Sequence, residues 1–349
     1  MGNNTIYNES KVNLKDLDLE ETRLWAEKIG LEPYRVEQIR QWIFKYHVES
    51  FSGMTNISKE LRDYLASLST ITQLKTVKTE ISADGTKKFL FELEDGNSIE
   101  SVLIPEKDHY TACISSQVGC AMGCSFCLTA AQGLKRSLEN FEIIDQIIQI
   151  SKSMDQPSML TNIVFMGMGE PLANFEAVKK AVKNIISQDA LNFSRRRVTI
   201  STCGLVPGIE KMGRELPVKL AVSLNAANDK TRNFLMPINK KYPLKRLIET
   251  LKRFPLPKGR RITFEYILIK DINDRPKDAQ SLAKIIKDIK AKINLIPFNR
   301  YDGSPFESPD EGRILAFQDE LIRKNYTVTV RKSKGSDISA ACGQLRTGL

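Results

Sequence analysis

The C-terminal part of the chain alternates between short β-rich runs and segments with helical periodicity. The expected strands lie at residues 110–116, 162–168, 197–202, 218–224, 262–269 and 293–298. Helical patterns follow most of these runs, and the alternation predicts parallel βα units. We therefore expect an α/β fold, a partial (β/α)6 barrel over residues 107–349, with reactive side chains at the C-terminal ends of its strands.

Two smaller segments precede the expected barrel. Residues 1–75 are predicted to form a helical accessory domain, because residues 14–67 place apolar side chains three and four positions apart and Ser58 is a candidate N-cap. Residues 76–106 alternate as β-strands do, and the dipeptide Asp95-Gly96 predicts a hairpin turn. This second segment is expected to be a β-hairpin extension that joins the helical domain to the barrel.

The chain carries an excess of positive charge. Its 349 residues include 52 Lys and Arg against 42 Asp and Glu, for a net charge of +10. This balance favours nucleic acid as a partner, although an ordinary basic protein would show the same totals. No apolar run is long enough to span a bilayer, and MGNNTIYNES has the features of neither an export signal nor a lipid anchor. We expect a cytoplasmic protein with no membrane role.

Four of the six cysteines crowd into residues 113–127, which indicates metal or redox chemistry rather than a disulfide framework. Cys120, Cys124 and Cys127 have the spacing C-x3-C-x2-C. Three thiolates on a [4Fe–4S] cluster leave one iron open to an exchangeable ligand, and S-adenosylmethionine (SAM) can fill that position through its amino and carboxylate groups. The sequence therefore predicts an iron–sulfur cluster at these three cysteines.

The alternative at the same cysteines is a structural zinc ion. Zinc prefers four closed ligands, so this alternative needs Cys113 or His109 to complete the set. The chain has only two histidines, which disfavours a His-rich metal site and a Ser-His-Asp triad.

Motifs along nearly the whole chain resemble one family, the RlmN and Cfr group of radical SAM RNA methyltransferases, which modify adenine at C2 or C8. The matching segments are YRVEQIRQWIF, MTNISKELR, SSQVGCAMGCSFC, FMGMGEP, RVTISTCG, LMPIN, NLIPFN and SDISAACGQL. The N-terminal segment and the context of the first cluster cysteine look more like the C2 enzymes. The resemblance implies a radical-SAM barrel that binds a [4Fe–4S] cluster and SAM.

The resemblance also implies roles for three residues outside the cluster motif. Cys342 would take a methyl group from one SAM molecule, and a radical generated from a second would activate that methyl for addition to the base. Cys113 would then form a disulfide with Cys342 and release the product. Glu100 would accept the proton that leaves C2. No family role attaches to Cys203, which we interpret as structural.

Positions that match the family's cofactor contacts lie mostly at the ends of the expected strands. They are Gly169, Glu170, Ser201, Ser223, Leu224, Asn225 and Asn299. Asn225 departs from the pattern, because the family usually has His there. An amide still donates and accepts hydrogen bonds, so we expect cofactor binding to survive the change.

By the same resemblance, the expected partners are 23S rRNA, tRNA and an electron donor such as flavodoxin or ferredoxin, and the chain is expected to be monomeric. Basic runs at 195–197, 258–261 and 331–334 are expected to hold RNA phosphates around the mouth of the barrel. Two alternatives stay open. One is the C8 reaction of the same family, and the other is an iron–sulfur RNA-binding protein without catalysis.

Overall fold

The computed structural model describes residues 11–346. The decapeptide MGNNTIYNES, predicted to carry no export or lipid signal, lies outside these residues. Within residues 11–346, no helix combines the length and the apolar character that a membrane span requires.

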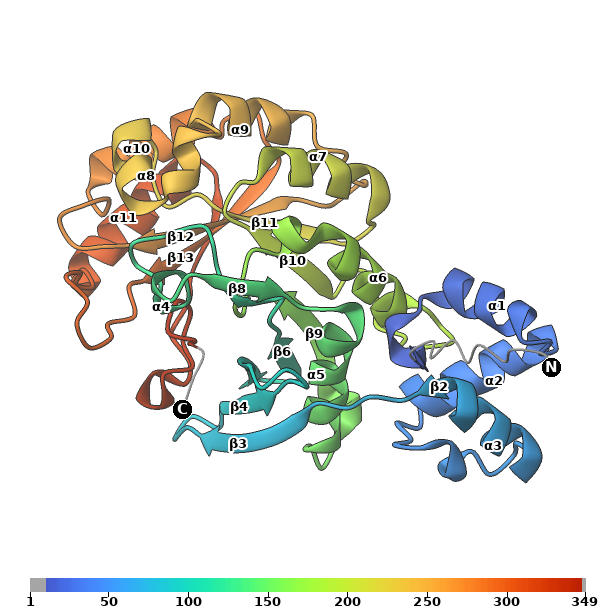
Figure 1. Ribbon diagram of the computed structural model, residues 1–349. Coiled ribbons are helices and arrows are strands. Elements are labelled where there is room, and N and C mark those ends of the chain that lie inside the picture. Colours follow the sequence, from blue (N-terminus) through green and yellow to red (C-terminus); the bar gives the residue numbers. More distant parts are fainter. Residues whose placement is uncertain (1–10, 347–349) are drawn as a thin grey trace.

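One sheet of ten strands dominates the molecule, in the order β14-β13-β12-β11-β10-β9-β6-β5-β4-β3 (Figure 1). Every neighbouring pair from β6 to β14 is parallel. The parallel strands are β6 Tyr110–Cys113, β9 Leu160–Phe165, β10 Val198–Thr202, β11 Lys219–Ser223, β12 Ile262–Leu268, β13 Ala291–Pro297 and β14 Thr327–Val330. The six expected strands are present and the α/β fold is confirmed. The seventh, β14, was not predicted.

Three antiparallel strands extend the same sheet on the side of β6. They are β3 Lys75–Ile81, β4 Lys87–Glu92 and β5 Ser98–Pro105. The predicted hairpin turn joins β4 to β5, where Gly96 has a φ of +77° that favours glycine. The extension is therefore hydrogen-bonded into the barrel sheet. The division of the chain at 75/76 and 106/107 stays a prediction.

Amphipathic helices cover the outer face of the parallel strands (Figure 1). In α6, for example, Val178, Ala181, Val182 and Ile185 are fully buried at spacings of three and four. The helices that follow the cysteine motif are α4 Leu128–Ala131, α5 Asn140–Lys152, α6 Phe175–Ile186, α7 Val206–Glu215, α8 Asp229–Leu235, α9 Leu244–Lys252, α10 Pro276–Ile285 and α11 Glu311–Arg323. Because the helices take the outer face, the inner face of the sheet is left for the site.

Three helices near the N-terminus lie beside α5 and α6, away from α8 to α11 (Figure 1). They are α1 Leu19–Lys28, α2 Pro33–Phe44 and α3 Lys59–Leu68. Asp18 and Glu21 form a capping box at the start of α1, and the predicted N-cap Ser58 accepts a hydrogen bond from the amide of Leu61. Local capping therefore sets where these helices begin. A short parallel pair, β1 Val12–Asn13 and β2 Ser69–Thr70, closes this region.

A buried ion pair docks this helical region on the barrel. Nζ of Lys15 lies 2.6 Å from a carboxylate oxygen of Asp145 on α5, and both side chains are almost fully buried. The other Asp145 oxygen accepts hydrogen bonds from the amide of Leu74 and from Gln149. A buried charge of this kind is tolerated only while it is paired and hydrogen-bonded.

Replacing Lys15 with Met is expected to lower the free energy of unfolding by about 3 kcal/mol, because the Asp145 carboxylate would remain buried without its counter-charge. Urea unfolding followed by circular dichroism measures the change. Lys28→Met, at an exposed position of α1, is the control and is expected to change stability by no more than about 0.5 kcal/mol. Equal stability of the two variants would contradict a docking role for the pair.

Candidate active site

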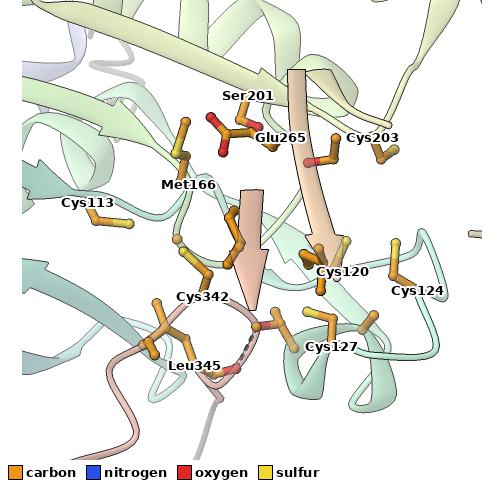
Figure 2. Close-up of a pocket in the computed structure, with 18 of the residues that line it drawn as sticks. Cys113, Cys120, Cys124, Cys127, Met166, Ser201, Cys203, Glu265, Cys342 and Leu345 are labelled. Carbon is orange, nitrogen blue, oxygen red and sulfur yellow. Dashed lines mark hydrogen bonds between the residues drawn. The ribbon is translucent and has the colours of Figure 1, made fainter. Parts of the chain in front are cut away.

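The C-terminal ends of the parallel strands open into one cavity of about 190 Å³. Side chains from the cysteine motif, from seven neighbouring strands and from the segment after β14 line it (Figure 2). The predicted site residues that line it are Cys113, Cys120, Cys124, Cys127, Gly169, Glu170, Ser201, Ser223, Asn299 and Cys342. Glu100, Leu224 and Asn225 do not line it. The fold therefore brings most of the predicted set together from distant parts of the sequence.

The three motif cysteines lie on a loop between two short antiparallel strands, β7 Gln117–Gly119 and β8 Leu134–Ser137. The amide of Cys120 donates to the carbonyl of Gly133, 2.9 Å away. A side chain at Gly119 would bring a Cβ to 1.8 Å from that same carbonyl oxygen, and Gly119 has a φ of +78°. Glycine is therefore required at the neck of the loop, where the two backbones approach closely.

The chemistry of this donor set fits an iron–sulfur cluster. Burial raises the pKa of all three thiols, to about 12 for Cys120, so thiolates at this site need the positive charge that iron supplies. Within residues 11–346, no three His, Cys, Asp or Glu side chains lie close enough to share a single metal ion. A [4Fe–4S] cluster takes one thiolate on each of three irons, and the three motif cysteines that line the cavity supply that number.

The turn after β9 carries Gly169 and Glu170. A Cβ at Gly169, whose φ is +97°, would lie 2.5 Å from Cβ of Gln117. The Glu170 carboxylate accepts hydrogen bonds from the amides of Leu172 (3.1 Å) and Cys203 (2.7 Å). The side chains of Thr202 and Cys203 also hydrogen-bond to this carboxylate, so Glu170 is held in a fixed position at the wall of the cavity.

Leu224 and Asn225 stabilise the strand ends rather than line the cavity. The amide of Leu224 donates to the carbonyl of Glu265, and Oδ1 of Asn225 accepts from the amide of Ile267 at 2.8 Å. Asn225 has a φ of +56°, a left-handed conformation that Asn adopts more readily than most residues. The family's usual His is therefore replaced here by a residue whose amide cross-links β11 and β12.

Cys342 lies on a segment that folds back over the cavity. Its carbonyl accepts a hydrogen bond from Nδ2 of Asn299 at 3.1 Å. The carbonyls of Gly343 and Leu345 accept from the amide of Leu128 and the hydroxyl of Thr129, on the cysteine loop (Figure 2). These contacts bind the segment directly to the residues that follow the motif.

The side chains of Cys113 and Cys342 point toward one another on one side of the cavity (Figure 2). Burial raises the pKa of the Cys113 thiol to about 12, and the neighbouring Cys342 contributes to that rise. The motif cysteines lie on the opposite side (Figure 2). The thiols of Cys113 and Cys342 therefore lie on one side of the cavity, and the three motif thiols lie on the other.

Glu100 lies behind the cavity, on β5. Its carboxylate is buried, pairs with Nζ of Lys88 at 3.1 Å and accepts a hydrogen bond from the amide of Arg346 at 2.9 Å. The carboxylate is thereby tied to the same C-terminal segment that carries Cys342.

Sequence reasoning missed two charged residues at the site. Glu265, in the middle of β12, lines the cavity, and burial raises its pKa. Arg232 is fully buried and donates hydrogen bonds to the carbonyls of Cys203 and Leu224, so it holds together the ends of β10 and β11. The sequence could have indicated Glu265, because a charged residue within an otherwise apolar strand often has a functional role. No such indication existed for Arg232, because its local sequence is that of an exposed helix.

Two of the three basic runs lie at the wrong end of the barrel for the role predicted for them. Residues 195–197 and 258–261 directly precede β10 and β12, so they lie at the N-terminal ends of parallel strands, opposite the cavity. Only the run 331–334 follows a strand, and Arg331, Ser333 and Lys334 line the cavity. The sequence reveals that these runs are basic. It does not reveal whether each run lies at the N-terminal or the C-terminal end of the strands, because that depends on where the strands begin and end.

Comparison with known proteins agrees with this geometry. The model of the radical SAM superfamily matches residues 114–283, and that of the ribosomal RNA large subunit methyltransferase N-terminal domain matches residues 12–71. A protein of Desulfosudis oleivorans named dual-specificity RNA methyltransferase RlmN is 52% identical over 93% of this chain and 88% of its own length. The chain belongs to the RlmN family. The predicted resemblance is thereby confirmed.

Further RlmN-family and structural matches cover the chain almost end to end. A protein of the same name from Syntrophus aciditrophicus is 46% identical over 96% of this chain and 97% of its own length. The crystal structure of a radical SAM methyltransferase from Sphaerobacter thermophilus superposes with a TM-score of 0.91 at 42% identity, covering 96% of this chain and 99% of that one. Membership of the radical SAM superfamily implies SAM and a [4Fe–4S] cluster as cofactors.

Proposed function

We propose that this chain methylates C2 of adenine in RNA, with Cys342 as the methyl carrier and Cys113 as the resolving thiol. The observation that supports the proposal most directly is the pair of thiols facing each other in the cavity that also receives the motif cysteines (Figure 2). Because C2 is an electron-poor carbon without a lone pair, it cannot attack a sulfonium methyl as ordinary acceptors do. A carrier thiol and a radical step remove that difficulty.

Cys120, Cys124 and Cys127 would hold the cluster. Gly169, Glu170, Ser201, Ser223 and Asn299 would contact SAM, as the resemblance implies. When bound, the cluster and SAM supply a sulfonium methyl group and a hydrogen-abstracting radical. The Cys342 thiolate displaces the methyl from sulfonium and becomes a thioether. We propose two SAM molecules per turnover, one for this transfer and one for the hydrogen abstraction.

The protein then releases its product through its own sulfur atoms. Once the carbon on Cys342 is bonded to C2, Glu100 accepts the proton that leaves C2, and the bound cluster would take up the unpaired electron of the adduct. The Cys113 thiolate attacks Sγ of Cys342, so an S–S bond forms as the C–S bond breaks, and the released carbon takes up a proton from water to become the methyl group. The disulfide leaves the two cysteines oxidised by two electrons, and a reductant must restore both thiols before the next turnover. Movement of Arg346 would free Glu100 for its role.

The relatives' name, dual-specificity RNA methyltransferase, supports two RNA substrates, which we propose are 23S rRNA and tRNA. The net charge of +10 and the basic run at the cavity are consistent with phosphate contacts. We further propose a cytoplasmic monomer that takes electrons from a flavodoxin or ferredoxin. The division into a helical domain (1–75), a β-extension (76–106) and a barrel (107–349) belongs to the same proposal.

The position of the new methyl tests the reaction itself. Anaerobically reconstituted protein, SAM, a reductant and an RNA with a single unpaired adenine are expected to yield 2-methyladenosine. Nuclease digestion followed by chromatography and mass analysis against 2-methyl and 8-methyl standards identifies the product. Methylation at C8 would support the alternative member of the family, and unmodified RNA would support a binding protein without catalysis.

Cys342→Ala is expected to reduce methylated product to background, because the carrier sulfur is lost. The same digestion and mass analysis measures it. Ser336→Ala, at an exposed position of the same segment, is expected to leave the product yield unchanged. Normal product from Cys342→Ala would contradict the thioether route.

Cys113→Ala is expected to trap RNA on the protein, because no thiol remains to break the bond between Cys342 and the base. A covalent adduct of protein and RNA is then visible by denaturing gel electrophoresis and disappears on nuclease treatment. Cys203→Ala keeps Cys113 and is expected to accumulate no adduct. If Cys113→Ala turned over freely, another group would have to resolve the intermediate.

A further inference from the structure

A row of polar side chains crosses four neighbouring strands, and two of its members, Ser223 and Glu265, line the cavity. Glu265 on β12 is in register with Ser223 on β11 and with Asn294 on β13, which pairs in turn with Thr329 on β14. Nδ2 of Asn294 donates to Oε1 of Glu265 at 3.0 Å, and the hydroxyl of Thr329 donates to Oδ1 of Asn294 at 3.2 Å. These hydrogen bonds hold the Glu265 carboxyl through its Oε1 atom only.

The second oxygen of that carboxyl has no protein partner. Oε2 of Glu265 is buried and makes no hydrogen bond to any of the residues 11–346, while the whole residue is only 5% exposed and lines the cavity. A buried polar atom left unpaired is unfavourable, and native structures rarely retain one without a reason. A donor carried by a bound ligand would satisfy it.

The position of Glu265 indicates which ligand supplies the donor. Its carboxyl lies beside Ser201 (Figure 2), and the charge of Arg331 acts on this carboxyl as well as on the thiols of Cys113 and Cys342. Ser201 and Ser223 are positions that match cofactor contacts. Carboxylates bind ribose hydroxyls in other nucleotide sites, since an acidic oxygen accepts well from a sugar hydroxyl.

We propose that Glu265 is a further cofactor-binding residue, whose free oxygen accepts a hydrogen bond from a ribose hydroxyl of SAM. The inference rests on the proposed function, because it requires that SAM binds in this cavity. It assigns to Glu265 the discrimination between a ribose and a deoxyribose cofactor. The alternative donor, the exocyclic amine of the target adenine, is separated by the experiment below.

Binding measured by calorimetry on the anaerobically reconstituted protein tests this assignment without turnover. The ligands are S-adenosylhomocysteine and its 2′-deoxy and 3′-deoxy analogues. For the unaltered protein, at least one analogue is expected to bind about 10- to 100-fold more weakly, the range for a hydrogen bond to a charged group. Equal affinity for all three ligands would overturn the proposal, and this comparison needs no variant to fold.

Glu265→Gln extends the test by replacing the acceptor with an amide of the same shape. It is expected to bind S-adenosylhomocysteine about 10- to 100-fold more weakly and to discriminate no longer against the affected analogue. Glu320→Gln, a buried glutamate on α11 outside the cavity, is the control and should bind all three ligands as the unaltered protein does.

Two results with Glu265→Gln would overturn the assignment. One is full retention of the discrimination between ribose and deoxyribose, and the other is unchanged S-adenosylhomocysteine affinity with weakened binding of the adenine-containing RNA. The second result would assign Glu265 to the base. Failure of the proposed function is recognised separately, as normal ligand discrimination by a protein that forms no 2-methyladenosine.

Discussion

Parallel hydrogen bonding from β6 to β14 is the constraint on which the rest of the structure depends. Because these strands run in one direction, the residues at their C-terminal ends meet at one edge, although they are separated by long stretches of sequence. Cys113, Ser201, Ser223 and Asn299 share a cavity for this reason. The same constraint places the basic residues that precede β10 and β12 at the opposite end, where they cannot contact a base in the cavity.

The sequence was informative where a feature of the structure is formed by residues that are close together in the chain. The spacing of Cys120, Cys124 and Cys127 predicted the cluster loop, and β-rich runs predicted six of the parallel strands. β14 was missed because its four residues, TVTV, alternate between exposed and half-buried and lack the apolar run of a central strand. Glu265 was missed because ITFEYILI indicates a buried strand without indicating which face borders a cavity. Only the register with Ser223 and Asn294 shows that.

Buried polar and charged groups in this protein are of two kinds. Some have hydrogen-bond or ion-pair partners in the chain, whereas others, at the cavity, lack them. The Lys15–Asp145 pair and Arg232 have protein partners for their buried groups. Glu265 lacks a partner for one oxygen, and burial raises the pKa of each motif thiol. Arg232 and the Lys15–Asp145 pair are therefore satisfied within the chain, whereas Glu265 and the motif thiols are left to be satisfied by what binds in the cavity.

The hydrogen bond between Thr129 and Leu345 joins residues 216 positions apart, and the Leu128–Gly343 bond next to it spans a similar stretch. During synthesis on the ribosome, the loop with the three thiols therefore emerges long before the segment that covers it. The loop and the segment that carries Cys342 can therefore be joined only after nearly the whole chain has been made.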